Sequence, residues 1–390
     1  MGLAFDAIRE EKKMSYSNIP EKIKLILMGK SGAKCEFRGC NKKILEETLT
    51  GKSGIYSNFA HIIADHVNGP RGDKELSPKL AKEESNVMVL CFEHHKLIDE
   101  NEKEYTVELL NEMKKEHEMY INELMKIPKN NNIIAVKYSS SISDRIPIIP
   151  DDDIRNSVRK QKMYNEGKII DLSGNTYSEK NNESFFRLEA NNLKECFLEN
   201  VRPLQKRDGN RKIYLYAIAP QPLLIYLGVL FSDISNVEVQ QLQREPIQEW
   251  YLGNEDDRKF DVNVIVPEKK NEKVALNISI TANIDEDRIR AIVGEECDII
   301  KIESTIHGND IIKNKSQLEK YNKMIRETFE TIKDTYGRDC EISIFPAMPI
   351  SIAIETGRCW MKKTHPNLII YDEKKGFKKA LEIKYEGEEG

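Results

Sequence analysis

Four residues with metal-binding side chains form two closely spaced pairs in the first hundred positions. Cys35-Glu-Phe-Arg-Gly-Cys40 places two thiols around a turn, and Cys91-Phe-Glu-His94 adds a third thiol and an imidazole. Tetrahedral zinc takes four sulfur or nitrogen ligands, commonly delivered as two such pairs. One pair alone would more readily be two buried small side chains. Two pairs predict a structural zinc site at Cys35, Cys40, Cys91 and His94.

A second set of polar residues runs through the same region. Asn58-Phe-Ala-His61 is followed by a Gly-Pro-Arg turn, then by Asn86, and then by His95 directly after His94. Phosphodiester hydrolysis needs an activated water, a cation on the phosphate oxygens and a stabilised leaving group. A His, an Asn and a His in this context, over roughly residues 30–100, resemble the HNH or ββα-metal nuclease motif.

This resemblance implies roles for His61, Asn86 and His95. His61 would be the general base, since a neutral imidazole suits that task near pH 7. Asn86 would pin the two β-strands, and His95 would bind the catalytic divalent ion, Mg²⁺ or Mn²⁺. If residues 91–99 open a helix, successive side chains point about 100° apart. His94 can then face the zinc while His95 faces the substrate groove.

The motif departs from many HNH enzymes at Ala60, where an Asp often helps to hold the metal. The second protein ligand therefore stays open. Asp65 and Asp99 are candidates, and either could instead be a solvated surface charge or a helix partner. We expect His66 to be a loop histidine.

Contact with double-stranded DNA would need a local basic face, because the formal net charge of the chain is −5. Nothing in the sequence suggests an element that reads bases, so low sequence specificity is expected. The basic residues around the first Cys pair either contact phosphates or are surface charges balanced by glutamates: Lys30, Lys34, Arg38, Lys42 and Lys43.

The periodicity of apolar residues divides the chain into three parts. Helical spacing is found over 21–30 and 103–125, within an N-terminal α+β domain at 1–130. Clusters of Pro, Ser and Asp over 131–165 predict a linker. Beyond it, buried strands alternating with helices, including a long helix over 317–337, predict an α/β domain at 166–390 with a largely parallel sheet. The strands are expected at 212–220, 262–267, 274–282, 297–304, 340–349 and 367–372.

Two segments of this second domain resemble each other. Ala219-Pro-Gln-Pro222 follows one apolar run and precedes another, and Pro346-Ala-Met-Pro349 does the same. This internal similarity is either a coincidence between two ordinary strand–helix turns or the result of duplication of a Rossmann-like half.

The stretches ALNISITANIDEDRI and CEISIFPAMPISIAIETGRCWMKKTHPNLIIYD resemble a SAVED domain, over roughly residues 165–390. SAVED domains resemble two fused CARF-like Rossmann halves and are joined to effectors of bacterial anti-phage systems (CBASS). The resemblance implies a cyclic di- or trinucleotide activator and a homo-oligomer, dimer or tetramer, on activation.

Residues that would hold this nucleotide are less clearly marked. Ser279 and Thr281, at a strand end, could bond phosphate or ribose. Arg358, Lys362 and Lys363 could meet phosphates, or the lysines could belong to a solvated loop. Trp360 could stack on a base or be a core aromatic.

No apolar stretch approaches the roughly 18–20 residues that span a bilayer, and residues 1–13 are too charged for a signal-peptide core. We therefore expect a cytoplasmic protein without membrane contact, in which cysteines are thiols or metal ligands. Four of them have no paired spacing and are expected to be buried thiols: Cys196, Cys297, Cys340 and Cys359.

The sequence thus predicts a metal-dependent DNA endonuclease that a cyclic oligonucleotide activates for anti-phage defence. Two alternatives remain. One is a constitutive HNH restriction-type enzyme whose C-terminal part recognises DNA, and the other is a non-catalytic zinc module that binds nucleic acid.

Overall fold

The computed structural model of the chain divides into two compact units, Met1–Pro128 and Lys129–Gly390. Within the described residues, no helix is both long and apolar enough to cross a membrane. The charged segment 1–13 lies outside the described residues. These residues are 18–47, 50–127, 131–142, 145–165, 167–174, 183–207, 211–232, 234–253 and 261–384.

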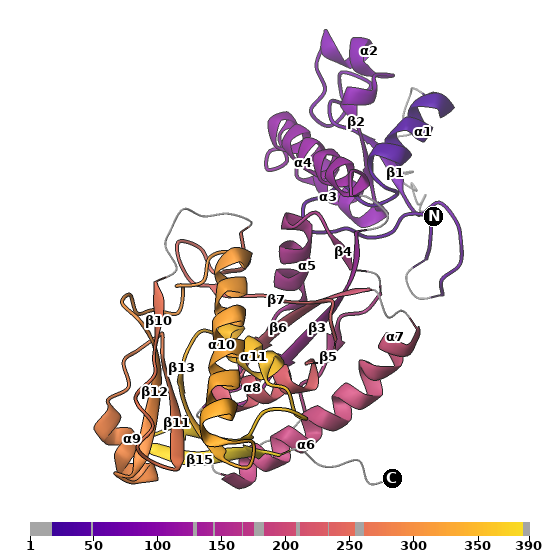
Figure 1. Cartoon of the computed structure of the whole chain (residues 1–390). Coiled ribbons are helices and arrows are strands. Elements are labelled where there is room, and N and C mark those ends of the chain that lie inside the picture. The colour runs from indigo at the N-terminus through magenta and orange to yellow at the C-terminus, as the bar shows by residue number, and fades with distance from the viewer. Residues whose placement is uncertain are drawn as a thin grey trace, which may run out of the picture. The chain divides into compact units, whose positions relative to one another are not determined.

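Unit 1 contains a two-stranded antiparallel sheet followed by a helix (Figure 1). β1 (Asn58–His61) pairs with β2 (Val87–Leu90), so that His61 lies opposite Val87. α3 (Phe92–Glu100) begins two residues after β2 ends. All four β2 residues are buried, which makes this strand the centre of the small apolar core of the unit.

Further helices complete unit 1. α1 (Glu21–Lys30) has the predicted bounds. α4 (Val107–Met125) begins four residues later than expected, because the Thr106 side chain accepts a hydrogen bond from the Leu109 N–H and caps the helix there. Two short helical segments lie between β1 and β2, namely α2 (Leu76–Leu80) and a 3₁₀ helix at Glu84–Asn86.

The first half of unit 2 is a parallel sheet with β3 (Asn132–Ser139) at its centre. β3 pairs with β6 (Lys212–Ile218) on one side and with two short strands on the other. The linker predicted over 131–165 is therefore wrong. Its apolar run is buried on both faces, so it lacks the alternation typical of a half-exposed strand, and polar clusters flank it. The other elements of this half are α5 (Asp151–Lys160), β4 (Tyr164–Asn165), β5 (Ile170–Asp171), α6 (Glu183–Asn200), α7 (Arg202–Arg207), α8 (Gln221–Leu230) and β7 (Val237–Val239).

The second half of unit 2 is a sheet of six strands. Its four central strands are parallel and one antiparallel strand lies at each edge. Five of the six predicted strands and the predicted long helix are confirmed here, and the sixth, over 212–220, is β6 of the first half. The α/β class is confirmed as well. The elements are β10 (Val262–Ile265), β11 (Lys273–Ser279), α9 (Glu286–Val293), β12 (Cys297–Ser304), α10 (Lys315–Tyr336), β13 (Glu341–Ala347), α11 (Ile350–Cys359), β14 (Asn367–Glu373) and β15 (Phe377–Ile383); the hairpin of β8 (Leu242–Gln243) and β9 (Glu249–Trp250) joins the halves.

Both halves follow one topology. In each, four parallel strands alternate with three main helices, and the spatial order is second, first, third, fourth: β4-β3-β6-β7 and β12-β11-β13-β14. α8 follows the third strand of its half, and α11 follows the third strand of the other. The two echoing segments are these equivalent strand–helix turns, so the structure favours duplication over coincidence.

α8 and α11 contact each other through matched glycines. A Cβ on Gly228 would lie 1.9 Å from the Ile354 carbonyl oxygen, and a Cβ on Gly357 would lie 1.9 Å from the Ile225 carbonyl oxygen. Both glycines are the eighth residue of their helix. The two backbones therefore meet directly, in a pseudo-symmetric crossing within the apolar core that joins the halves.

Candidate functional site

The predicted zinc ligands come together in unit 1. One ligand atom from each of Cys35, Cys40, Cys91 and His94 lies within 4.8 Å of all the others. A turn between Lys34 and Lys43, which pair as a β-bridge, brings Cys35 and Cys40 together. Cys91 and His94 come from the start of α3. Sulfur atoms around a tetrahedral zinc ion lie about 3.8 Å apart, given Zn–S bonds near 2.3 Å, so the spacing fits that ion.

The surroundings of this thiol cluster also suit a metal. Burial raises the pKa of the Cys35 thiol, so a thiolate here requires a nearby cation. The backbone N–H of Cys91 points to Cys35 Sγ at 3.3 Å, and Phe37 stacks on the His94 ring with the centroids 4.0 Å apart. The other four cysteines are free thiols away from this cluster: Cys297 and Cys359 are buried, and Cys196 and Cys340 are half-buried.

His61 ends β1, and Asn86 lies just before β2, where its backbone carbonyl accepts from the N–H of Ile62. His61 Nε2 donates to the Ala81 carbonyl at 2.9 Å, which leaves Nδ1 as the nitrogen able to accept a proton. The buried Asn86 side chain accepts from the Ile63 N–H and donates to the Ile63 carbonyl, at 2.9 and 2.8 Å. Asn86 therefore fixes the segment that follows the histidine, as the motif implies.

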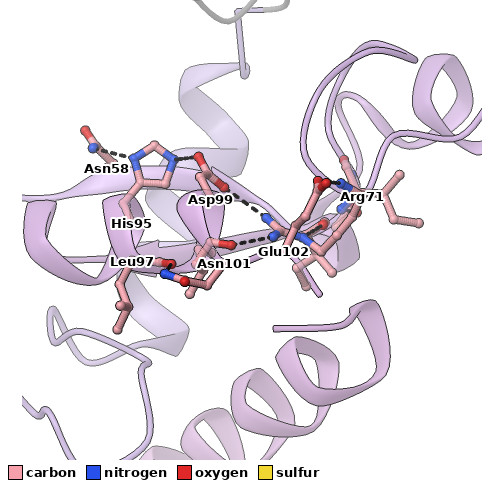
Figure 2. A network of polar contacts seen from close by, with 11 residues as sticks. Asn58, Arg71, His95, Leu97, Asp99, Asn101 and Glu102 are labelled. Atoms are coloured by element: carbon pink, nitrogen blue, oxygen red, sulfur yellow. Dashed lines mark hydrogen bonds and ion pairs between the residues drawn. The ribbon is translucent and has the colours of Figure 1, made fainter. Parts of the chain in front are cut away.

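His95 lies on α3, between Asn58 of β1 and Asp99 one turn further along (Figure 2). Its Nδ1 is 2.7 Å from Asn58 Nδ2, and its Nε2 is 3.3 Å from Asp99 Oδ2. Burial, the largest cause, lowers the pKa of His95, and the charges of Arg71 and His61 lower it further against the opposing effect of Asp99. β1 therefore carries His61 at its last residue and, at its first, the Asn58 that contacts His95.

Arg71 was missed by the sequence analysis as a member of this site. Its guanidinium donates to the Ile62 carbonyl, the Ile98 carbonyl and Asp99 Oδ1, at 2.7, 2.7 and 3.0 Å (Figure 2). The Gly-Pro-Arg turn was its only signal in the sequence. Asn58 was quoted as part of the motif but given no role.

Asp65 is paired with its neighbour in the sequence. Its buried carboxylate is 2.9 Å from His66 Nδ1, whereas Asp99 is the carboxylate beside His95. Among the described residues, the only cluster of three or more His, Cys, Asp or Glu ligand atoms close enough for a metal is the thiol cluster. Asp65 as a ligand of the His95-bound ion therefore stays a prediction.

Most of the basic residues around the first Cys pair are balanced by glutamates. Arg38 contacts Glu112 and Glu116, and Lys42 contacts Glu93 at 3.1 Å. Lys30 pairs with Glu84 and Lys43 with Glu46. This favours the surface-charge interpretation over a dedicated phosphate-binding face.

In unit 2, the carboxyl ends of the central strands form a polar edge. Ligands of doubly wound sheets bind where the strand order reverses, which here is between the first and third strands of each half. Ser279 ends β11 at this point, paired with Ala347, and Ser139 ends β3 in the equivalent position, paired with Ile218. Ser139 was missed because its strand was assigned to a linker.

The predicted nucleotide-binding residues do not form one group. Ser279 is buried, and its hydroxyl is bonded to Asn277 and to the Ile284 N–H; Thr281 is half-buried nearby. Arg358 and Trp360 lie at the other end of α11, roughly 15 Å along a helix of this length. Arg358 pairs with Glu355 at 2.6 Å and bonds backbone carbonyls.

Trp360 is 1% exposed and donates to the Pro366 carbonyl, which matches the core-aromatic interpretation. Lys362 and Lys363 are exposed in the turn that follows α11. These residues therefore lie away from the polar edge at which Ser279 and Thr281 end their strand.

The topology of unit 2 defines a doubly wound α/β protein built from two Rossmann-like halves. The family model for SAVED, described as "SMODS-associated and fused to various effectors sensor domain", matches residues 195–383, just under half of the chain. This part of the chain is thus a SAVED domain.

The comparison with solved structures matches Cap4 SAVED/CARF-domain containing receptors. That of Acinetobacter baumannii is 13% identical, with 76% of this chain and 61% of that chain covered and a TM-score of 0.40. The same receptor with the cyclic trinucleotide 2'3'3'-cAAA is 12% identical, with 80% and 71% covered and a TM-score of 0.42. The Moraxella osloensis receptor is 12% identical, with 80% and 70% covered and a TM-score of 0.40. No curated protein matches the chain.

Proposed function

We propose that the protein is a metal-dependent endonuclease with low sequence specificity for double-stranded DNA, activated by a cyclic oligonucleotide in anti-phage defence. The proposal is supported by three features of unit 1: His61 ends β1, Asn86 holds the segment after it, and His95 contacts Asn58 of the same strand. The same unit contains the thiol cluster, and the chain also contains a SAVED sensor domain.

The residues of unit 1 divide the chemistry among them. His61 accepts a proton from water at Nδ1, because its Nε2 is held by the Ala81 carbonyl. Asn86 keeps the segment after His61 in place, so the His61 imidazole keeps its orientation. A divalent ion at His95 would supply positive charge for the phosphate oxygens. Cys35, Cys40, Cys91 and His94 would hold a structural zinc ion that completes the small core.

Unit 2 would bind the activator at the polar edge formed by the strand ends at Ser139 and Ser279. A cyclic oligonucleotide is the ligand class that the SAVED family implies. Such a ligand activates only if it binds the active, self-associated state more tightly than the free protomer. The ligand and the cleavage reaction are thus linked through assembly of the chain.

Plasmid degradation, measured with Mg²⁺ or Mn²⁺ against a panel of cyclic di- and trinucleotides, tests the proposal. We expect cleavage with one ligand of the panel and a loss of about 10²–10⁴-fold in His61→Ala. His117→Gln is a matched control, because His117 Nε2 also donates to a backbone carbonyl, that of Ser31, at 2.9 Å.

Other results would contradict the proposal in distinct ways. Full cleavage by His61→Ala would remove the assigned base. Sequence-specific cutting without any small molecule would favour a constitutive restriction-type enzyme. DNA binding without cleavage under every condition would favour a non-catalytic zinc module.

A further inference from the structure

The loop that carries Arg71 is wound so tightly that the side chain points into the protein. Arg71 has φ +54°, which is uncommon for a residue with a Cβ. A Cβ on Gly72 would lie 2.3 Å from the Val67 carbonyl oxygen, and one on Gly69 would lie 2.5 Å from the Ala64 Cβ. The side chain of Arg71 is only 4% exposed. The tight backbone of this loop thus places the Arg71 guanidinium in the interior of unit 1.

This guanidinium joins the two elements that carry the candidate site. Nε donates to the Ile62 carbonyl, which follows His61, and Nη1 donates to the Ile98 carbonyl in the last turns of α3. The Arg71 backbone N–H adds a bond to Glu102 Oε2 at 3.2 Å (Figure 2). A planar fork can make these bonds in fixed directions, whereas a lysine ammonium cannot.

The third bond of the guanidinium continues to His95. Nη2 binds Asp99 Oδ1, and the other oxygen of the same carboxylate lies 3.3 Å from His95 Nε2 (Figure 2). An ionised carboxylate only accepts hydrogen bonds, so Nε2 carries the proton. On the opposite side, the Asn58 amide nitrogen is 2.7 Å from Nδ1 and donates to it. Both contacts agree on the tautomer with a lone pair at Nδ1, and a bound ion would replace the Asn58 amide as the partner of that lone pair.

We propose that Arg71 is a positioning residue which, through Asp99, fixes His95 in the Nε2–H tautomer and so makes Nδ1 the nitrogen that binds the divalent ion. The inference rests on the proposed nuclease function, because it concerns the ion of that site. Arg71 itself touches neither the ion nor DNA. Its effect is to hold the carboxylate aimed at His95 Nε2, as partners behind metal-ligating histidines generally do.

Nitrogen NMR of the full-length protein, labelled with ¹⁵N-histidine and prepared with zinc but without Mg²⁺ or Mn²⁺, reads the tautomer directly. His95→Gln identifies the signals. We expect Nδ1 of His95 to be unprotonated in the wild type. In Asp99→Asn the two tautomers should mix, because an amide can either donate or accept. Nδ1 protonated in the wild type would overturn the inference.

Binding of Mn²⁺, followed by the electron paramagnetic resonance of the free ion with His95→Gln as the baseline, gives a second readout. Asp99→Asn and Arg71→Met should each raise the dissociation constant about tenfold or more, and Arg71→Lys should rescue part of the loss. Arg38→Met, a surface guanidinium paired with Glu112 and Glu116, should leave it unchanged.

Wild-type affinity and tautomer in both Asp99→Asn and Arg71→Met would refute the role of Arg71. If Arg71→Met fails to fold, as judged by its zinc content, the near-isosteric Asp99→Asn decides. Neither readout involves DNA. The predicted tautomer and Mn²⁺ affinity in a protein that never cleaves DNA would therefore refute the nuclease proposal alone.

Discussion

The two units place their polar groups in opposite ways. The small core of unit 1 includes Cys35 and Cys91, and its helix α3 carries two adjacent histidines in two different polar environments. The centre of unit 2 is apolar, and there α8 and α11 meet through Gly228 and Gly357. In unit 1 residues proposed to bind metal are therefore part of the core, whereas in unit 2 the core depends on a close contact between two helix backbones. Substitutions in the two units should therefore destabilise the protein for different physical reasons.

The largest effect is expected from removal of one ligand of the thiol cluster. Cys91→Ala should leave unit 1 unfolded and unit 2 intact, because structural zinc contributes on the order of 10 kcal/mol to the folding of small domains. Calorimetry should show loss of one of two transitions, and elemental analysis should show loss of zinc. Cys196→Ala, a half-buried thiol outside the cluster, is the control. A folded wild-type protein without zinc would contradict the prediction that unit 1, unlike unit 2, needs a metal to fold.

A smaller effect, confined to unit 2, is expected at the helix crossing. In Gly357→Ala the new Cβ meets the Ile225 carbonyl oxygen, so the helices must separate. Overpacking of this kind costs about 3 kcal/mol, which corresponds to roughly 10 °C in the Tm of a unit this size. Gly29→Ala, on α1 with nothing within 4 Å of the new Cβ, should cause no loss. Equal melting of Gly357→Ala and the wild type would mean that the crossing is not tight.

The smallest effect concerns a buried histidine of unit 2. His365 accepts from the Met361 N–H at Nδ1 and faces Glu330 with Nε2. Burial, the largest cause, lowers the pKa of His365 below its usual value of 6.5, although Glu330 opposes this. The folded state therefore binds fewer protons than the unfolded state, and the stability of unit 2 should fall as the pH drops through 6.5.

Chemical denaturation at pH 7.5 and 5.5 measures this pH dependence. The difference in the free energy of unfolding of unit 2 between the two pH values should shrink in His365→Leu. An unchanged difference would place the pH response elsewhere in the chain. The response of unit 1 to the same change of pH provides the comparison between the units.

The sequence revealed those parts of the site that have a short characteristic spacing or follow the motif of a known family. The Cys pairs and the adjacent histidines of α3 have the spacing that one turn or one helix start imposes, so their convergence could be predicted. Arg71 could not be found this way, since its partners Ile98 and Asp99 lie more than 25 positions away. Only the folded loop shows that its guanidinium points inward.

Contacts between residues far apart along the chain also explain why some predictions for unit 2 were less successful. β3 resembled a linker because Asn and Ser clusters flank it, and its role at the centre of a sheet depends on strands far along the chain. Arg358 and Trp360 were grouped with Ser279 because all three lie in the two stretches that resemble a SAVED domain. A ten-residue helix carries them to the opposite end of the sheet.

The crossing of α8 and α11 also limits how this molecule can change. At most buried contacts, a larger side chain on one partner can be offset by a smaller one on the other. At Gly228 and Gly357 the opposing atoms belong to the main chain of Ile354 and Ile225, and no substitution of a side chain can make them smaller. The contact between α8 and α11 thus constrains the amino-acid sequence of unit 2 more tightly than the loops and edge strands do.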